Sequence, residues 1–256
     1  MKAYLVFFSV LSPAAWAQHA LAPPEVGFIQ DGYGQIHIVN GLAGNFLVGA
    51  AVSSGIISSG YSGSFGLLKA DSALIVVDRQ GRGVASVAAP AGSALFAFSA
   101  NGSPALAYFE QSKTLLVWDG HTFQPEGPQG NQVPLAISSL NSKRAAFIVQ
   151  RDRGLWQLDV ELATGAIVSQ AALPGVTAPV LLPASGGLVF SDSKGVVVRH
   201  EDGSEKHIAA VLPANFVFSQ MGNGWIQITD TATGRLLAVN IQPGHEQSYL
   251  LPEVRP

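Results

Sequence analysis

Short apolar runs alternate with clusters of turn residues along most of the chain. The segment LLVWDG (Leu115–Gly120) ends an apolar run with an acid and a glycine, and LIVVDRQG (Leu74–Gly81) and IHIVNG (Ile36–Gly41) have the same form. Apolar runs of this length, bounded by Gly, Asn, Asp and Ser, are typical of β-strands. Because no long stretch places apolar residues at positions i, i+3, i+4 and i+7, we expect almost no helix after the N-terminal segment. The chain is therefore predicted to be all-β.

Two landmarks recur together along the chain. The residues that follow the apolar runs are Asn40, Asp78, Asp119, Asp159, Arg199 and Asp230, with steps of 38, 41, 40, 40 and 31 residues. The apolar residues that lead the preceding strands are Phe28, Leu67, Tyr108, Phe147, Phe190 and Phe218. A period near 40 residues is that of a four-stranded propeller blade. The spacing predicts about six four-stranded units arranged in a ring.

A closer match between two segments supports the repeat. Ala163-Thr164-Gly165 leads to Pro174-Gly175, and Ala232-Thr233-Gly234 leads to Pro243-Gly244. Together with the FSANG and LLVWD segments (from Phe98 and Leu115), these motifs resemble the repeats of YVTN, WD40 and TolB-type β-propellers. The resemblance covers nearly all of the chain after the N-terminal segment and implies a propeller. It implies little about function, because propellers serve as scaffolds, receptors, lectins and enzymes. Two features depart from the pattern: the Gly-His pair that opens many WD40 repeats is missing, and Arg199 replaces the acid of the fifth unit.

The two ends of the repeat array are irregular. Val26–Gln30 matches the second strand of later units, so the first unit lacks a first strand. The short last step of 31 residues indicates that one unit lacks a strand or has a shortened connection, which would leave five complete blades. The spare apolar run Ser248–Leu251 is predicted to pair into the first blade and close the ring, because closure removes exposed sheet edges.

Composition and charge exclude several classes of function. Hydrophobic residues make up 48% of the chain and charged residues only 12%, and the net charge is −3. We therefore expect a large core and neither a nucleic-acid partner nor an anionic membrane surface. The chain has no cysteine, which excludes disulfides, thiolate nucleophiles, cysteine-based zinc sites and a lipid anchor on cysteine.

The N-terminus has the form of a secretory signal peptide. Lys2 precedes the apolar run Ala3–Leu11, and Ala15-Trp16-Ala17 has the small-x-small form of a cleavage site. The run is too short to span a membrane, and no later segment is long and apolar enough to do so. We expect residues 1–17 to be a signal peptide and residues 18–256 a single propeller domain, periplasmic or extracellular.

Candidate chemistry is sparse. The acid after each apolar run is interpreted as a turn-former that bonds its own backbone, with a shared ligand role as the alternative. Ser191–Lys194 has the S-x-x-K spacing but lies between two strands instead of at the start of a helix, so we interpret it as a hairpin turn. The histidines lack H-x-x-x-H spacing, and Trp118, Trp156 and Trp225 lie in apolar runs that favour packing between blades over sugar stacking. We assign no catalytic residue, no metal site and no cofactor.

The face that carries the loops between second and third strands is the predicted binding surface. The candidate binding residues on it are Tyr33, Lys113, Arg151, Asp152, Arg153 and Lys194. The repeat and the absence of a convergent acid–base or metal set of residues favour an exported, non-enzymatic scaffold that binds a protein or a glycan through one face of the ring. The alternative is an enzyme with its site at the central channel, either a metal-dependent hydrolase or lactonase or a quinone-dependent oxidoreductase. That alternative requires several Asp, Glu, Asn or His side chains, or a stacking Trp with Arg partners, converging at one channel mouth. A degenerate relic of a larger propeller is a third reading.

Overall fold

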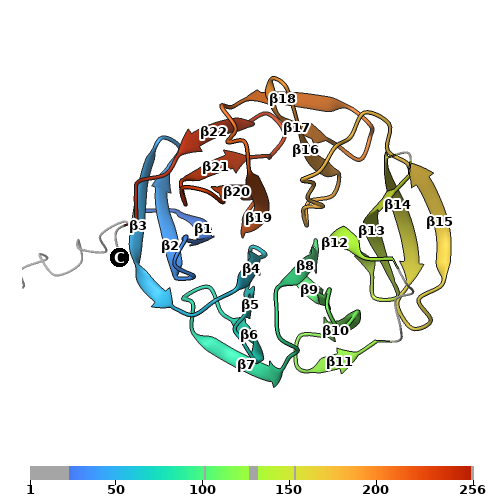
Figure 1. The fold of residues 1–256 in the computed structure, drawn as a ribbon. Helices are drawn as coiled ribbons and strands as arrows, with labels where there is room; N and C mark the ends of the chain where they lie inside the picture. The colour runs from blue at the N-terminus through green and yellow to red at the C-terminus, as the bar shows by residue number, and fades with distance from the viewer. Residues whose placement is uncertain (1–22, 101, 127–131, 153, 255–256) are drawn as a thin grey trace, which may run out of the picture.

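Six antiparallel sheets stand in a ring around a central axis (Figure 1). The computed structural model describes residues 23–100, 102–126, 132–152 and 154–254. Within these ranges all regular structure is strand, and no helix exists that is long and apolar enough to cross a membrane. The chain is a six-bladed β-propeller. The predicted fold class is confirmed, whereas the proposed signal peptide, residues 1–17, lies outside the described residues.

Each sheet is one blade, numbered in chain order. Blade 1 consists of β1 (Glu25–Gln30), β2 (Ile36–Leu42) and β3 (Asn45–Ser53). Blade 2 consists of β4 (Ser58–Tyr61), β5 (Gly66–Lys69), β6 (Ala73–Val77) and β7 (Gly83–Ala88). Blade 3 consists of β8 (Ala94–Ser99), β9 (Gly102–Phe109), β10 (Thr114–Trp118) and β11 (Phe123–Pro125). Blade 4 consists of β12 (Pro134–Asn141), β13 (Arg144–Arg151), β14 (Gly154–Glu161) and β15 (Ile167–Ala172). Blade 5 consists of β16 (Leu188–Asp192), β17 (Gly195–Arg199) and β18 (Glu205–Ala209). Blade 6 consists of β19 (Phe216–Gly222), β20 (Trp225–Asp230), β21 (Leu236–Asn240) and β22 (Gln247–Leu250).

Burial is highest in the second and third strands of the blades, lower in the inner strands and lowest in the outer strands. The second strand of blade 3, β9, is buried on both faces over Ala105–Phe109, because each face packs against a neighbouring blade. The outer strand of blade 4, β15, is exposed throughout. Strands buried on both faces read as continuous apolar runs, which explains why the second and third strands gave the clearest sequence signal.

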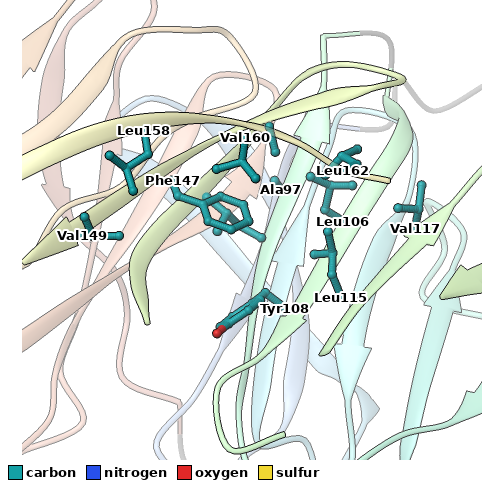
Figure 2. Close-up of a cluster of buried hydrophobic side chains, with 12 residues drawn as sticks. Ala97, Leu106, Tyr108, Leu115, Val117, Phe147, Val149, Leu158, Val160 and Leu162 are labelled. Carbon is teal, nitrogen blue, oxygen red and sulfur yellow. The ribbon is translucent and has the colours of Figure 1, made fainter. Parts of the chain in front are cut away.

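The core between blades 3 and 4 illustrates how neighbouring blades pack. Phe147 and Leu158 of blade 4 share one buried cluster with Tyr108 and Leu115 of blade 3, and Figure 2 shows the Phe147 ring between Leu158 and the blade 3 side chains. The rings of Tyr108 and Phe147 lie 6.0 Å apart between centroids. Burying one such side chain contributes about 1.5–3 kcal/mol. Similar clusters lie between the other pairs of blades, so the ring has no single central core.

Blade 1 has three strands and lacks an innermost one. The C-terminal end of its first strand, β1, lies beside the N-terminal ends of the inner strands of other blades. Because β1 is therefore antiparallel to those inner strands, it has the direction of a second strand. Figure 1 shows β1 farther from the axis than β4 and β19, which contact each other in front of it. The prediction that Val26–Gln30 is a second strand with nothing before it in the ring is confirmed for the described residues.

The predicted mode of ring closure is wrong. The run Ser248–Leu251 does not pair into blade 1. Most of it lies in β22 (Gln247–Leu250), which pairs with β21 as the outer strand of blade 6. An apolar run identifies a strand but not its neighbour, and here the adjacent strand along the chain was the nearer partner. The ring is closed by side chains instead.

The Gln227 side chain makes hydrogen bonds to β1 that the missing inner strand would otherwise make. Its side-chain amide donates to the carbonyl oxygen of Gln30 at 2.7 Å and accepts from the N–H of Gln30 at 3.0 Å. A buried β1 edge would otherwise leave these two backbone groups unpaired. Glycine at position 27 allows the close approach of β19, because a Cβ atom there would clash with the backbone carbonyl of Met221.

Aromatic side chains complete this seam between blades 6 and 1. Phe46 of β3 meets Trp225 and Tyr249 of blade 6 edge-on, with centroid distances of 5.6 and 5.5 Å. Leu251, which follows β22, is buried in the same cluster, and Val254 packs against it. The C-terminal segment therefore reaches blade 1 through side-chain packing and not through strand pairing.

Blade 5 is irregular at the axis. Its inner strand is reduced to a single bridge between Leu181 and Val189, so β16 occupies the second-strand position. The landmark Phe190 therefore lies in a second strand like the four before it, whereas Phe218 lies in β19, an inner strand. The last step of the repeat, from Arg199 to Asp230, is short because the two residues are not equivalent: Arg199 ends the third strand of blade 5, whereas Asp230 ends the second strand of blade 6. The interpretation of a missing strand or shortened connection was wrong for that step.

The acids after the apolar runs form turns, as predicted, in three units. Asp119 Oδ1 accepts from the N–H groups of His121 and Thr122, and Asp78 and Asp230 make the same type of turn. Hydrogen bonds from the backbone of Thr122 lower the pKa of Asp119. Asp159 differs: it lies inside β14 and accepts from the Ser169 hydroxyl at 2.7 Å.

Candidate functional site

The strongest candidate site is a hollow where the blades converge at the axis. It has a volume of about 370 Å³ and is lined by residues from all six blades, chiefly at the starts of β4, β8, β12 and β19. These starts lie on the face that also carries the turns between second and third strands, which we call the upper face. The opposite, lower face carries the turns that follow the inner strands. We call the hollow on the upper face the channel mouth.

The wall of the channel mouth is almost free of charge. Hydroxyl and amide side chains alternate with apolar ones, and Asp31 is the one charged residue among those that line it. The polar lining residues are Gln30, Ser58, Ser59, Ser93, Ser219, Gln220, Gln227 and Thr229. Several of them already hold the backbone: the Gln220 amide accepts from the N–H of Ala184 and donates to the carbonyl of Leu182. The wall therefore suits an uncharged group.

Asp31 is fully engaged. Its Oδ1 accepts from the N–H groups of Tyr33 and Gln35 at 2.9 and 2.8 Å, and its Oδ2 lies 3.2 Å from His37 Nε2. His37 Nδ1 lies 2.9 Å from the carbonyl oxygen of Gly49, which can only accept. Each ring nitrogen of His37 thus faces an oxygen atom, one from the turn and one from β3. Both side chains are almost wholly buried, so the pair braces the β1–β2 turn and its carboxylate has no free oxygen for a substrate.

The described residues of the channel mouth include no set of side chains suited to acid–base or metal chemistry. Among residues 23–100, 102–126, 132–152 and 154–254, no three His, Cys, Asp or Glu side chains come together as a possible metal site. The lining contains no Trp and no Arg. What the wall can do is enclose an apolar or neutral polar group and hydrogen bond to it through hydroxyls such as those of Ser93 and Ser219.

Exposed aliphatic residues surround the channel mouth. Ile57, Leu135 and Val217 open the inner strands of blades 2, 4 and 6 and are 43%, 38% and 48% exposed. Exposed apolar residues gathered around a hollow are characteristic of binding surfaces.

Tyr33, predicted as a binding residue, lies beside a second hollow on the upper face. This hollow has a volume of about 660 Å³ and lies at the seam, between the turn that carries Tyr33, the β20–β21 turn and the C-terminal segment from Leu250 to Val254. Tyr33 is 65% exposed. The two turns approach each other closely at Gly32 and Gly234.

The charged candidates share the upper face but are not brought together. Lys113, Arg151, Asp152 and Lys194 lie in turns between second and third strands of blades 3, 4 and 5, and none lines a described hollow. Arg151 is held against its own blade: its guanidinium lies 5.1 Å from the Trp156 ring and donates to Gln170. Lys113 has a φ of 53°, so it occupies the left-handed backbone position of the β9–β10 turn. Arg153 lies outside the described residues.

Sequence reasoning missed the aliphatic residues of the channel mouth. Ile57, Leu135 and Val217 stand in apolar runs and were indistinguishable from core residues. The available signal was their place in the unit: each lies at or just before the start of an inner strand, where the chain enters the ring from the upper face. That place becomes readable only once the inner strands are assigned.

No family model matches the chain, and no curated protein matches it. Solved structures do match. The chain is similar to the hydrazine synthase of Kuenenia stuttgartiensis, with 12% identity, a TM-score of 0.48 and coverage of 93% of this chain and 80% of that one. It is also similar to the Cps50 (Swd1) β-propeller domain of Myceliophteria thermophila (13%, 0.44, 77% and 72%) and to the Pan2 WD40 domain of Neurospora crassa (13%, 0.46, 94% and 83%). The fold assignment rests on the ring of six blades, and these distant matches add nothing about function.

Proposed function

We propose that the chain is an exported β-propeller scaffold that binds a protein partner at the channel mouth. The observation that carries this proposal is the set of exposed aliphatic residues, Ile57, Leu135 and Val217, around an uncharged hollow. A hollow of about 370 Å³ lies within the range of sites that enclose a small group.

Binding at this site would follow the usual division of an interface. One or two uncharged side chains of the partner enter the hollow, where apolar contact with Leu135 and Val217 supplies most of the affinity. The turns that carry Tyr33, Lys113, Arg151 and Lys194 form the outer rim, where charges guide orientation and contribute less to affinity.

A protein partner is favoured over a glycan at this particular site. A sugar needs unpaired hydrogen-bonding groups around it, whereas Gln220 and Gln227 of the channel mouth are already bonded to the backbone. The sugar-stacking alternative for the tryptophans gains no support either, since Trp118 is buried between blades 2 and 3 and Trp225 packs in the seam. The enzyme alternative gains no support from the lining, because its one carboxylate, Asp31, is held by the turn and by His37.

Export is inferred from the N-terminal segment alone. The positive start at Lys2, the apolar run Ala3–Leu11 and the Ala15-Trp16-Ala17 site support cleavage after Ala17. N-terminal sequencing of the exported protein should give Gln18 as the first residue. An intact N-terminus on the protein recovered outside the cytoplasm would contradict this part of the proposal.

The binding proposal is tested by quantitative affinity capture from envelope extract with the mature protein. Val217→Glu places a charge at the channel mouth, and we expect it to reduce capture of the partner at least tenfold, equivalent to about 1.4 kcal/mol. Val84→Glu is the matched control, since Val84 is a similarly exposed valine on the outer strand β7. Equal capture by the two variants would contradict the proposed site, and no specific capture by the wild type would contradict the proposed function.

A further inference from the structure

A second hollow lies on the lower face, away from the channel mouth. It has a volume of about 590 Å³ and lies among the lower ends of the blade 3 and blade 4 inner strands and the irregular part of blade 5. Its origin is the interrupted inner strand of blade 5. After the bridge at Leu181 the chain forms a loop in place of a strand, so the lower half of β12 has no inner strand of blade 5 beside it. Gly187 fits this loop against the backbone of Arg199, where a Cβ atom would clash.

The lining of this lower hollow is amphipathic. One set of side chains carries hydroxyl or amide groups, namely Ser99, Ser138, Ser139, Gln157 and Ser185. Another set is aliphatic, namely Leu140, Leu173, Leu182 and Leu188. Such a combination suits a ligand that has both polar edges and an apolar face.

Two buried hydroxyls in the lining have no partner. Ser99 Oγ and Ser139 Oγ are shielded from solvent and make no hydrogen bond in the described part of the chain. Each is near the lower end of an inner strand, Ser99 on β8 and Ser139 on β12, two neighbouring strands of blades 3 and 4. Buried hydroxyls are nearly always paired, so two orphans at one hollow indicate a missing bonding partner.

The lining offers no free cation to an anionic ligand. The Arg199 guanidinium is bound by Glu205, with its Nε and one terminal nitrogen at 2.8 and 2.7 Å from the same carboxylate oxygen. Glu201 lies on the same turn and adds a negative charge to the lining. Because the guanidinium is already paired and a carboxylate lies beside it, an anionic ligand is disfavoured, and the hydroxyl and amide groups of the lining suit a neutral polar ligand.

We propose that the lower hollow binds a neutral, hydroxyl-bearing small molecule of monosaccharide size, either free or as the terminal unit of a glycan. Ligand hydroxyls both donate and accept, so they can pair with Ser99, Ser139 and the Gln157 amide. The apolar face of a sugar ring would lie against Leu140 and Leu182. This site is separate from the channel mouth and does not depend on the protein-binding proposal.

The test is a titration of the mature protein with a panel of neutral hexoses, N-acetylhexosamines and oligosaccharides that end in these units, alongside their acidic counterparts. Methyl NMR signals provide the readout. We expect neutral sugars to shift the methyl signals of Leu140 and Leu182 and to leave those of Leu135, at the channel mouth, unchanged. Binding of free sugars identifies a free ligand, whereas binding only of oligosaccharides identifies a terminal unit. If no sugar shifts these signals, or if only acidic sugars do, the proposal is overturned and an ordered water accounts for the orphan hydroxyls.

Matched serine variants separate binding from folding. Ser139→Ala and Ser99→Ala should each weaken sugar binding at least tenfold while leaving the melting temperature of the free protein unchanged or raised, because each removes an unpaired buried hydroxyl. Ser93→Ala, at the channel mouth, is the control and should leave sugar affinity unchanged. Undiminished binding by the Ser139→Ala and Ser99→Ala variants would overturn the assignment of the site. Val217→Glu should leave sugar binding intact, so failure of one proposal is distinguishable from failure of the other.

Discussion

The interface between blades 3 and 4 and the seam between blades 6 and 1 perform the same task with different parts. At the first, two complete four-stranded sheets meet over a cluster of large side chains that includes Tyr108, Phe147 and Leu158. At the seam, one blade lacks its inner strand, and an amide side chain, three aromatic rings and the C-terminal segment close the gap. The difference shows that a repeat fold tolerates a lost strand when side chains pair the exposed backbone and fill the space.

The largest effect is expected at the regular interface. Phe147→Ala removes a ring from the centre of the blade 3–blade 4 cluster and leaves a cavity, which should lower the free energy of unfolding by about 3–5 kcal/mol. Urea denaturation followed by circular dichroism measures this loss. A loss below that of the seam variants described next would show that the regular interface is not the stronger of the two.

A smaller effect is expected for the C-terminal contact at the seam. Leu251→Ala removes a buried side chain from the cluster with Phe46, and should cost about 2 kcal/mol, the lower end of the usual range for such a change, because a chain end relaxes more easily than a strand. Leu250→Ala is the control, since Leu250 is largely exposed and should change little. Equal losses in the two variants would remove Leu251 from the account of ring closure.

The amide substitute for the missing strand can be tested by itself. Gln227→Leu keeps the approximate size of the side chain but leaves the N–H and carbonyl of Gln30 unpaired, at an expected cost of about 1–3 kcal/mol. Hydrogen exchange should locate the change, with faster exchange of the Gln30 amide. Gln227→Glu retains the acceptor for that N–H and should keep its exchange slow while still losing the bond to the carbonyl. Unchanged exchange in Gln227→Leu would contradict the role assigned to this amide.

The smallest effect is expected at an exposed turn, the one that follows β10 in blade 3. Hydrogen bonds from the backbone of Thr122 lower the pKa of Asp119, so this carboxylate stabilises the fold above its unfolded pKa, about 3.9, and loses that contribution as pH falls through the folded value. Asp119→Ala should therefore lower the melting temperature at pH 7, and the difference from the wild type should shrink at strongly acidic pH. A difference that stays constant with pH would show that the charge of Asp119 does not matter.

The sequence predicted what depends on local pattern. The strands around Phe28, Leu67, Tyr108, Phe147 and Phe190 were readable because strands buried on both faces form continuous apolar runs. The same period placed Tyr33, Lys113, Arg151 and Lys194 on one face. The prediction that failed, the mode of ring closure, depends on which strand pairs with which. Ser248–Leu251 was recognised as apolar, but its pattern gave no information on whether blade 6 or blade 1 would take it.

The candidate sites were harder to predict for a related reason. Ile57 and Val217 look like core residues in the sequence, and only the ring shows that they open at the channel mouth. The lower hollow lies where blade 5 lacks most of its inner strand. The residue pattern near Leu181 does not reveal that Ser139, on the inner strand of blade 4, has an unpaired hydroxyl. Charged residues such as Arg151 and Lys194 stand out in a chain with so few charges, whereas an uncharged binding surface has no such signal in the sequence.

The most direct test of the central claim is photo-crosslinking from defined positions of the exported protein in living cells. A photoreactive amino acid at position 217 reports on the channel mouth, and the same amino acid at position 84 reports on the outer edge of blade 2. We predict one specific protein adduct from position 217 and none from position 84. An adduct from position 84 with none from position 217 would contradict the proposal that this propeller binds its partner through the channel mouth.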